Sequence, residues 1–316
     1  MNIYIYARDI RVNDAIGEFC LAIAESLIDT LIQPILLAEN YDEGLSVKNI
    51  DELFVSDIHD NDIIFFNHSI YDPHMERMLS INCKKILYFH NITPPELLEN
   101  KQTQRDCEAG IKQIALYSNF DYVLCNSELT KKTIQSHVNL TTKILTIPPY
   151  IISSKIMNKS SAPLLDASYL IYCGRLSPHK RVDALIDWFL EYSKSKNISN
   201  LKLVLISNDV NVFKYSKEDS IITYHSVSNE SLMNLLAHSM GFVTFSLHEG
   251  FCVPAFLSSI NNVPIYVSEV ELFSEINFYP VHDIKLFNIA NLLSRRKSSY
   301  IRYYSVMDFL REVILE

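Results

Sequence analysis

The chain alternates between short apolar runs and longer segments in which apolar residues recur every three or four positions. Runs of the first kind predict buried strands, and the three-to-four spacing predicts helices. In the first half, the predicted strands cover residues 2–6, 34–38, 63–67, 85–90, 122–125 and 143–147. The predicted helices cover residues 19–31, 101–117 and 128–136, with further helix signals after Pro73. Strands that alternate with helices predict a parallel, doubly wound sheet.

A further helix is predicted near residue 93. Thr93 has the place of an N-cap, Pro94 that of the first helical residue, and Glu96 that of the acid in a capping box. This pattern predicts that a helix begins at Thr93.

The second half repeats the alternation after a break. Pro148-Pro149 and a stretch rich in Ser, Lys and Asn interrupt it. The predicted strands then cover residues 169–173, 202–206, 221–224, 241–245 and 264–267, and the predicted helices cover 182–193, 229–237 and 300–316. A chain of 316 residues suits two domains. The predicted divisions are a first domain over residues 1–152, a linker over 153–167, a second domain over 168–299 and a C-terminal helix over 300–316.

The composition, 48% hydrophobic and 21% charged, is that of a globular protein. Residues 1–150 hold 12 Lys and Arg against 21 Asp and Glu, and the remainder holds 16 against 16. The acidic first half argues against nucleic acid as a partner. A polyanionic ligand would favour the second half.

Six cysteines are scattered singly without a C-x-x-C pair, which favours reduced thiols in the cytoplasm. The start of the chain lacks the basic region of a signal peptide. The longest apolar runs are far shorter than the roughly 20 residues of a membrane span. Membrane association would therefore be peripheral, at the inner face of the plasma membrane.

Several common site types lack their sequence signature. There is no G-x-G-x-x-G after a strand, no P-loop and no Ser nucleophile elbow, which argues against a dinucleotide oxidoreductase and a P-loop kinase. Asp60-Asn61-Asp62 precedes its strand, so a solvated turn is favoured over a metal-binding pair. Lys101, Arg105 and Lys112 share one helix face, for which solvation is favoured over contact with lipid phosphate. No metal site is predicted.

Three places at the carboxyl ends of predicted strands carry candidate chemistry. The strand 241–245 ends in a turn with an acid, a glycine and a proline, which suits a ligand approaching a helix N-terminus. Arg175 and Lys180 lie in a strand-to-helix loop. They either bind an anion between them or are simply solvated residues of a surface loop. His90 also follows a strand, and a buried structural histidine is the default interpretation. For Glu249, ligand binding and a structural role are equally favoured.

Together these segments resemble a known family. Gly174-Arg175-Leu176-Ser177-Pro178-His179-Lys180 and His248-Glu249-Gly250-Phe251-Cys252-Val253-Pro254 are similar to motifs of glycosyltransferase family 4, the retaining GT-B enzymes. Asp14-Ala15-Ile16-Gly17, Tyr88-Phe89-His90-Asn91-Ile92-Thr93-Pro94 and Cys125-Asn126-Ser127-Glu128 resemble first-domain motifs of its bacterial polysaccharide and O-antigen members. The resemblance implies an α/β fold of GT-B type, in which two doubly wound Rossmann-like domains face a central cleft and the C-terminal helix packs back on the first domain.

The resemblance also implies roles for individual residues. Arg175 and Lys180 would hold the donor diphosphate, Glu249 would bind hydroxyls of the donor sugar, and His90 would lie beside the reacting sugar. These four form the implied catalytic set. Asp14 and Gly17 would face the acceptor and phosphate. The donor-binding turn would include the main chain of Gly250, Phe251, Cys252 and Val253.

The implied activity is transfer of a hexose, with retention, from a UDP- or GDP-linked sugar to a glycan or lipid-linked acceptor in cell-surface polysaccharide, lipopolysaccharide or O-antigen synthesis. It would need no cofactor besides the nucleotide-sugar co-substrate and no obligatory metal. The main departure is Leu257, which stands where the family has a second Glu that bonds the ribose. Losing a charge-assisted bond of this kind costs about 1.5–3 kcal/mol. A catalytically degenerate binding subunit therefore remains as an alternative. A GT-B nucleotide-sugar epimerase is a third, less favoured one.

Overall fold

The structure is a computed structural model that describes residues 1–28, 32–140, 143–150, 162–276, 281–287 and 305–315. The chain divides into two compact units, Met1–Ile152 with Tyr303–Glu316, and Ser153–Arg302. Most of the predicted linker and the first residues of the predicted C-terminal helix lie outside the described residues.

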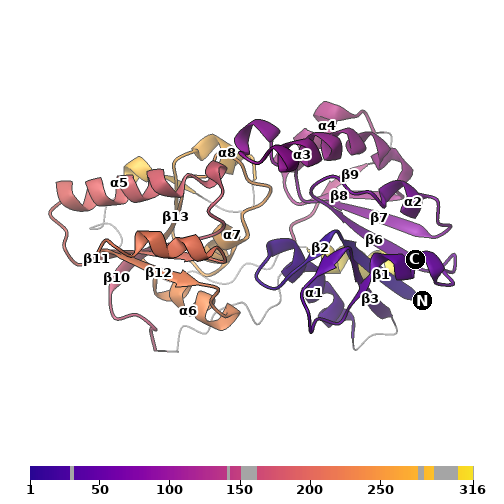
Figure 1. Ribbon diagram of the computed structural model, residues 1–316, viewed down its shortest axis with the longest axis horizontal. Coiled ribbons are helices and arrows are strands. Elements are labelled where there is room, and N and C mark those ends of the chain that lie inside the picture. The colour runs from indigo at the N-terminus through magenta and orange to yellow at the C-terminus, as the bar shows by residue number, and fades with distance from the viewer. Residues whose placement is uncertain (29–31, 141–142, 151–161, 277–280, 288–304, 316) are drawn as a thin grey trace. The chain divides into compact units, whose positions relative to one another are not determined.

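The first unit is built on a seven-stranded parallel sheet (Figure 1). Its strands in spatial order are β5 (Val47–Asn49), β3 (Gln33–Ala38), β1 (Asn2–Ala7), β6 (Ile63–His68), β7 (Lys84–Phe89), β8 (Tyr122–Cys125) and β9 (Ile144–Thr146). Along the chain this is the order 3-2-1-4-5-6-7 of a Rossmann sheet. The short strands β2 (Asp9–Ile10) and β4 (Asn40–Tyr41) pair separately.

Both faces of this sheet are covered by a hydrophobic core. Alternate residues of each strand point to opposite faces and so belong to different cores. Ile3 and Ile5 belong to one core, together with α1 (Ala15–Leu27) and α10 (Val306–Leu315). Tyr4 and Tyr6 belong to the opposite core. The helices that contribute to this second core are α2 (Met75–Leu79), α3 (Lys101–Gln113) and α4 (Glu128–His137). The prediction that the C-terminal helix packs on the first domain is confirmed by its buried apolar side chains in that core.

The second unit repeats the plan with six parallel strands. Their spatial order is β12 (Ile221–His225), β11 (Leu201–Ser207), β10 (Ser168–Cys173), β13 (Gly241–Thr244), β14 (Ile265–Val267) and β15 (His282–Asp283). The α-helices described in this unit are α5 (Val182–Ser195), α6 (Asn229–His238), α7 (Val253–Ile260) and α8 (Val270–Ser274) (Figure 1). The order along the chain is 3-2-1-4-5-6, so the direction of winding reverses between β10 and β13. Ligands of such sheets bind at this reversal, outside the carboxyl ends of the strands.

The short 3₁₀ turns of the described chain are η1 (Ile50–Val55), η2 (Pro95–Leu97), η3 (Ile114–Asn119), η5 (Pro178–Lys180), η6 (Val210–Tyr215) and η7 (Ile284–Leu286). Two of them correct the sequence predictions. The helix predicted to begin at Thr93 is wrong, because Pro94 is extended and only the η2 turn follows. A residue that precedes a proline is disfavoured in the helical region, and Pro95 places Pro94 in that position. The next α-helix begins at Lys101, where the Asn100 side chain accepts from two main-chain N–H groups. It ends earlier than predicted and continues as η3.

The interpretation of Asp60-Asn61-Asp62 needs a partial correction. The segment does precede β6, but the Asp62 side chain is fully buried. Its carboxylate accepts the N–H of Asn2 at 2.6 Å and that of His59 at 3.1 Å, so it anchors the start of β1. Within the described ranges, no three His, Cys, Asp or Glu side chains are grouped to hold a metal ion.

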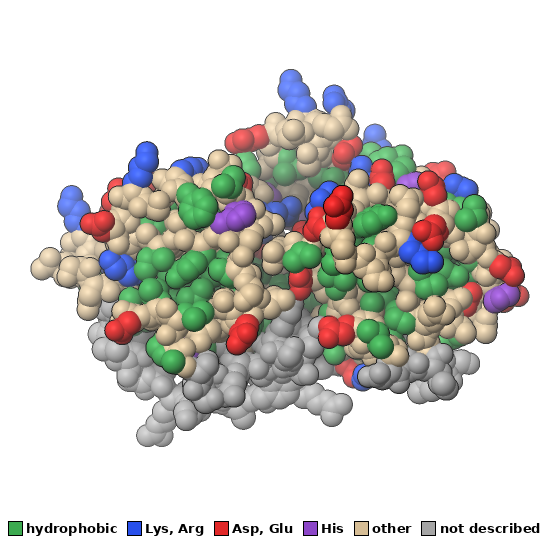
Figure 2. Space-filling view, turned by 60° about the horizontal axis from the view of Figure 1, so that its bottom comes forward, with side chains coloured by type: hydrophobic (Ala, Val, Ile, Leu, Met, Phe, Trp, Pro, Cys, Tyr) green, Lys and Arg blue, Asp and Glu red, His purple; other side chains and the backbone are tan. Residues whose placement is uncertain are grey.

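The surface of the described residues carries mixed charges. Figure 2 shows Lys and Arg interspersed with Asp and Glu over the face in view. Lys101, Arg105 and Lys112 of α3 are exposed, as a solvated face requires, and their contact with lipid stays a prediction. No helix in the described part of the chain combines the length and the hydropathy needed to cross a bilayer.

Candidate functional site

The winding reversal of the second sheet brings two predicted loops together. Strands β10 and β13 are parallel neighbours, so the loops that follow them leave the same edge side by side. The N–H of Leu247 donates to the carbonyl of His179 at 2.8 Å and ties the loops to each other. As a result, Lys180 Nζ lies 2.7 Å from Glu249 Oε1. The structure thus pairs two residues that the sequence placed in one donor pocket.

This ion pair is largely shielded from solvent, with side-chain exposures of 13% for Lys180 and 10% for Glu249. Burial by itself raises the pKa of Glu249, but the charge and hydrogen bond of Lys180 outweigh it, aided by the Ser246 hydroxyl and by His248. The net effect is a pKa of Glu249 below its usual value of 4.5. At neutral pH, Glu249 is therefore a carboxylate, and it already compensates the charge of Lys180.

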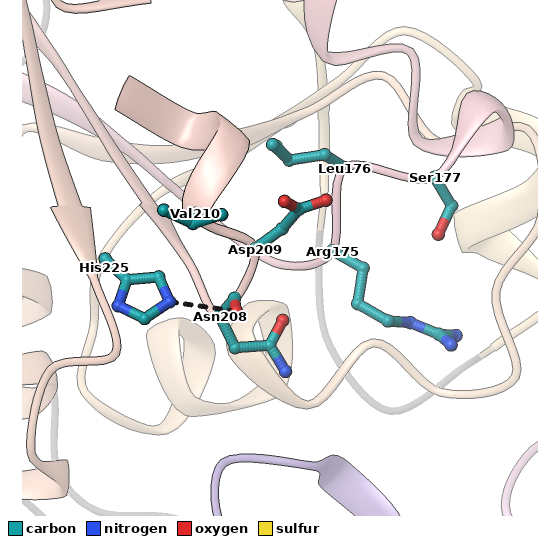
Figure 3. A pocket seen from close by; sticks show the side chains of 7 residues that line it. All are labelled: Arg175, Leu176, Ser177, Asn208, Asp209, Val210 and His225. Atoms are coloured by element: carbon teal, nitrogen blue, oxygen red, sulfur yellow. Dashed lines mark hydrogen bonds between the residues drawn. The ribbon is translucent and has the colours of Figure 1, made fainter. Parts of the chain in front are cut away.

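Arg175 is differently placed. Its side chain is exposed and has no hydrogen bond or ion pair within the described residues; only its carbonyl is engaged, accepting from the Tyr172 hydroxyl at 2.8 Å. It lines an open pocket of about 540 Å³. The pocket lining consists of Arg175, Leu176, Ser177, Asn208, Asp209, Val210 and His225 (Figure 3). Of the two predicted diphosphate ligands, Arg175 is the cation without a compensating partner.

Three polar residues of this pocket were not predicted from the sequence, namely Asn208, Asp209 and His225. Asp209 Oδ1 accepts the main-chain N–H of Asn211 at 2.9 Å and its side-chain N–H at 2.8 Å, while Oδ2 has no partner in the described chain. His225 Nε2 donates to the carbonyl of Asn208 at 3.1 Å (Figure 3). All three stand at or just after the carboxyl ends of β11 and β12. The rule that ligands bind at these ends could have identified them.

The turn before α7 has a left-handed residue at its last position. Cys252 is the N-cap of α7 with φ 61° and ψ 71°, a backbone conformation that residues other than glycine rarely adopt. Just before it, Phe251 is buried and its ring lies 5.0 Å from that of Phe256. The turn is thus anchored by an apolar side chain, and the main-chain roles of Gly250, Phe251, Cys252 and Val253 toward a donor stay a prediction.

The conformation of Cys252 predicts an inverted preference at a helix start. At ordinary helical positions, alanine is about 1 kcal/mol more stable than glycine. Here, Cys252→Gly should be more stable than Cys252→Ala by about 1 kcal/mol, because only the alanine incurs the left-handed penalty. Urea denaturation of both variants measures the difference. An alanine variant as stable as the glycine variant would show that this turn is not left-handed in solution.

Leu257 lies within α7 and is 3% exposed. Its carbonyl accepts from the Asn261 side chain at 2.7 Å. The apolar side chain is therefore part of the buried surface of the helix, and position 257 offers no hydrogen-bonding group to a ribose.

In the first unit, His90 follows β7 and is half-buried, so the default of a buried structural histidine holds only in part. Its Nε2 lies 2.8 Å from Asn67 Oδ1, and its ring packs edge-on against Phe19 and Tyr88. Burial, followed by the nearby His68, lowers the pKa of His90 to about 3. His90 is therefore neutral at physiological pH.

Asp14 and Gly17 have structural roles at the start of α1. The Asp14 carboxylate caps the helix by accepting the N–H groups of Ile16 at 3.0 Å and Gly17 at 3.2 Å. A Cβ on Gly17 would stand 2.3 Å from the Arg11 carbonyl oxygen, so only glycine fits there. These contacts explain both residues without a ligand, and their predicted contact with acceptor and phosphate stays a prediction.

The sequence matches no protein-family model. It also matches no curated protein. The structure, in contrast, is similar to many solved structures. A sucrose-phosphate synthase from Thermosynechococcus elongatus is 14% identical with a TM-score of 0.64, covering 84% of this chain and 80% of that one. The N-terminal domain of a Candida albicans trehalose-6-phosphate phosphatase is 13% identical with a TM-score of 0.60, covering 99% and 96%.

A third structure, described as trehalose-6-phosphate from E. coli bound with UDP-2-fluoro glucose, is 11% identical with a TM-score of 0.57 and covers 93% of this chain and 91% of that one. At these identities, the likeness shows the fold alone. The fold is GT-B, with two Rossmann-like domains, as the family resemblance implied.

Proposed function

We propose that this protein is a glycosyltransferase that takes a hexose from a nucleotide-sugar donor. The observation that carries the proposal is the carboxyl edge of the second sheet, where Arg175, which has no ion pair in the described residues, lines an open pocket and where Lys180 and Glu249 form a shielded ion pair. A guanidinium offers paired donors that match phosphate oxygens. The similar structure that contains UDP-2-fluoro glucose shares this fold and supports the choice of donor class.

In this proposal, the pocket holds the nucleoside and Arg175 the diphosphate. Leu257 offers no acid to the ribose, but Asp209 Oδ2 lies in the pocket without a partner in the described chain. Because Oδ1 is held by Asn211, the carboxylate is fixed in place and Oδ2 is oriented to accept from ribose hydroxyls or from a base N–H. Asp209 would thus supply the acceptor that position 257 lacks.

The finer features of the proposal follow the resemblance to glycosyltransferase family 4. Transfer would retain the configuration, need no metal or cofactor, and use a glycan or lipid-linked acceptor of cell-surface polysaccharide or O-antigen synthesis. Departure of a nucleoside diphosphate needs stabilised charge and alignment more than a protein nucleophile. We place the enzyme in the cytoplasm, where its six free thiols would stay reduced, with peripheral contact to the inner membrane face as part of the proposal.

Leu257 also favours a second candidate, a degenerate relative that binds a glycan or a partner enzyme without catalysis. A buried leucine has replaced the acid of the family pattern. If Asp209 does not take over its function, nucleotide binding would be weaker by about 1.5–3 kcal/mol.

A nucleotide panel separates the two candidates. UDP or GDP at 100 times its Kd should stabilise the folded protein by about 2.7 kcal/mol and raise its Tm. Asp209→Asn keeps the Oδ1 cap but replaces Oδ2 with a donor, so it should weaken binding about tenfold or more. Asp219→Asn, an exposed residue outside the pocket, is the matched control and should bind normally. Differential scanning fluorimetry over a concentration series measures all three proteins.

The same panel includes the corresponding nucleotide sugars, with release of the nucleoside diphosphate as the activity readout. Nucleotide binding, together with release of the nucleoside diphosphate when an acceptor receives the sugar, supports the transferase. Failure of all nucleoside diphosphates to shift the wild-type Tm at millimolar concentration would favour the degenerate relative instead.

A further inference from the structure

Asn67 connects two strands at the carboxyl edge of the first sheet. It lies near the end of β6, which pairs with β1 on one side and with β7 on the other. The residue is 4% exposed, and its side chain reaches both neighbours: Nδ2 donates to the carbonyl of Tyr6 at 3.0 Å, and Oδ1 accepts from His90 Nε2 at 2.8 Å. The main chain of His90 is fixed as well, because its N–H donates to the carbonyl of His68 at 2.9 Å.

These contacts determine which way the Asn67 amide points. A main-chain carbonyl can only accept, so the side that faces Tyr6 must be the NH₂ group. The same NH₂ group lies 3.4 Å from Cys20 Sγ, a weak acceptor. The carbonyl oxygen of the amide therefore faces His90.

The amide in turn determines the tautomer of His90. Because Asn67 Oδ1 can only accept, His90 Nε2 must carry the proton in the neutral ring. The other nitrogen, Nδ1, then has a lone pair and no proton. It has no hydrogen-bond partner in the described part of the chain, and the residue is half-buried.

We propose that Asn67 is a positioning residue that holds His90 as the Nε2–H tautomer, so that His90 Nδ1 accepts a hydrogen bond from a hydroxyl of a sugar bound at the carboxyl edge of the first sheet. The sugar contact rests on the proposed function, whereas the tautomer does not. In this arrangement His90 is a hydrogen-bond acceptor and does not donate a proton to the leaving group. The interaction selects a hydroxyl donor and rejects a group that only accepts.

The tautomer is measured directly by two-bond ¹H–¹⁵N correlation spectra of protein labelled with ¹⁵N-histidine. His90→Gln identifies the His90 signals among the ten histidines of the chain. Three further variants complete the set. Asn67→Leu removes the acceptor at similar volume, and Asn67→Asp retains an acceptor oxygen. Asn126→Leu is the matched control, because Asn126 bonds His90 only through its main-chain carbonyl, at 3.3 Å.

The wild type, Asn67→Asp and Asn126→Leu should show the Nε2–H form, and Asn67→Leu should show a mixture with the Nδ1–H form. In the transferase assay, Asn67→Leu should lower kcat about tenfold, with a smaller change in KM, and Asn67→Asp should restore part of the loss. A wild-type spectrum with the Nδ1–H form would overturn the proposal. So would an Asn67→Leu protein with an unchanged tautomer and unchanged kcat. If the tautomers are as expected but the wild type turns over no nucleotide sugar, the proposed function fails while the positioning role of Asn67 stands.

Discussion

Glu249→Ala should lower the free energy of unfolding of the second unit by about 3–5 kcal/mol. The substitution leaves the Lys180 ammonium in a site where only 13% of the side chain is exposed and where its counter-charge at 2.7 Å has been removed. Trp188 in α5 is the only tryptophan of the chain and belongs to this unit. Its fluorescence during urea denaturation therefore reports the stability of the unit that holds the pair.

The double variant Lys180→Met with Glu249→Leu removes the whole ion pair, whereas Glu249→Ala leaves the Lys180 charge unpaired. Replacing both partners of a buried pair with apolar side chains is often neutral or stabilising, so the double variant should be more stable than Glu249→Ala. A Glu249→Ala protein within about 1 kcal/mol of wild type would indicate an exposed pair, because exposed ion pairs contribute no more than this.

Glu249→Ala should also change how the stability of the protein responds to acid. The folded pKa of Glu249 lies below its unfolded value, so the carboxylate contributes stability above pH 4.5 that is lost as the pH falls through the folded pKa. Wild-type stability should therefore decline below pH 4.5 by an increment that Glu249→Ala lacks. Equal declines in both proteins would assign the acid sensitivity to other groups.

Arg175→Ala should weaken the binding of UDP or GDP ten- to a hundredfold, which corresponds to about 1.5–3 kcal/mol for a hydrogen bond to a charged group. Stability should be unchanged, because the side chain is exposed and has no hydrogen bond or ion pair in the described residues. Isothermal titration calorimetry measures the affinity. Arg175→Ala should therefore change affinity and leave stability unchanged, whereas Glu249→Ala should lower stability.

Arg175→Lys is the matched variant, since it keeps the charge but loses the planar pair of donors. Its affinity should lie between those of the wild type and Arg175→Ala. If Arg175→Ala binds nucleoside diphosphates as tightly as the wild type, the diphosphate does not contact Arg175.

The fold was accessible from the sequence because its signals are local. Apolar runs and three-to-four spacing reflect the periods of single strands and helices, and a helix such as α4 was predicted to within one residue of its bounds. The errors arose where a neighbour overrides a local pattern. Pro95 disfavours the helical conformation at Pro94, and the hydrogen bond from the Asn2 N–H stabilises the Asp62 carboxylate in its buried position.

By itself, the sequence determined that two doubly wound sheets form and that Arg175, Lys180, Glu249 and His90 follow strands. It could not determine which side chains meet. Lys180 and Glu249 form a pair because β10 and β13 are neighbours in the sheet, although β11, β12 and two helices separate them along the chain. Asn67 faces His90 because β6 lies beside β7. Strand adjacency depends on how the helices cover the sheet, so only the tertiary structure decides which charge is compensated and which ring nitrogen carries the proton.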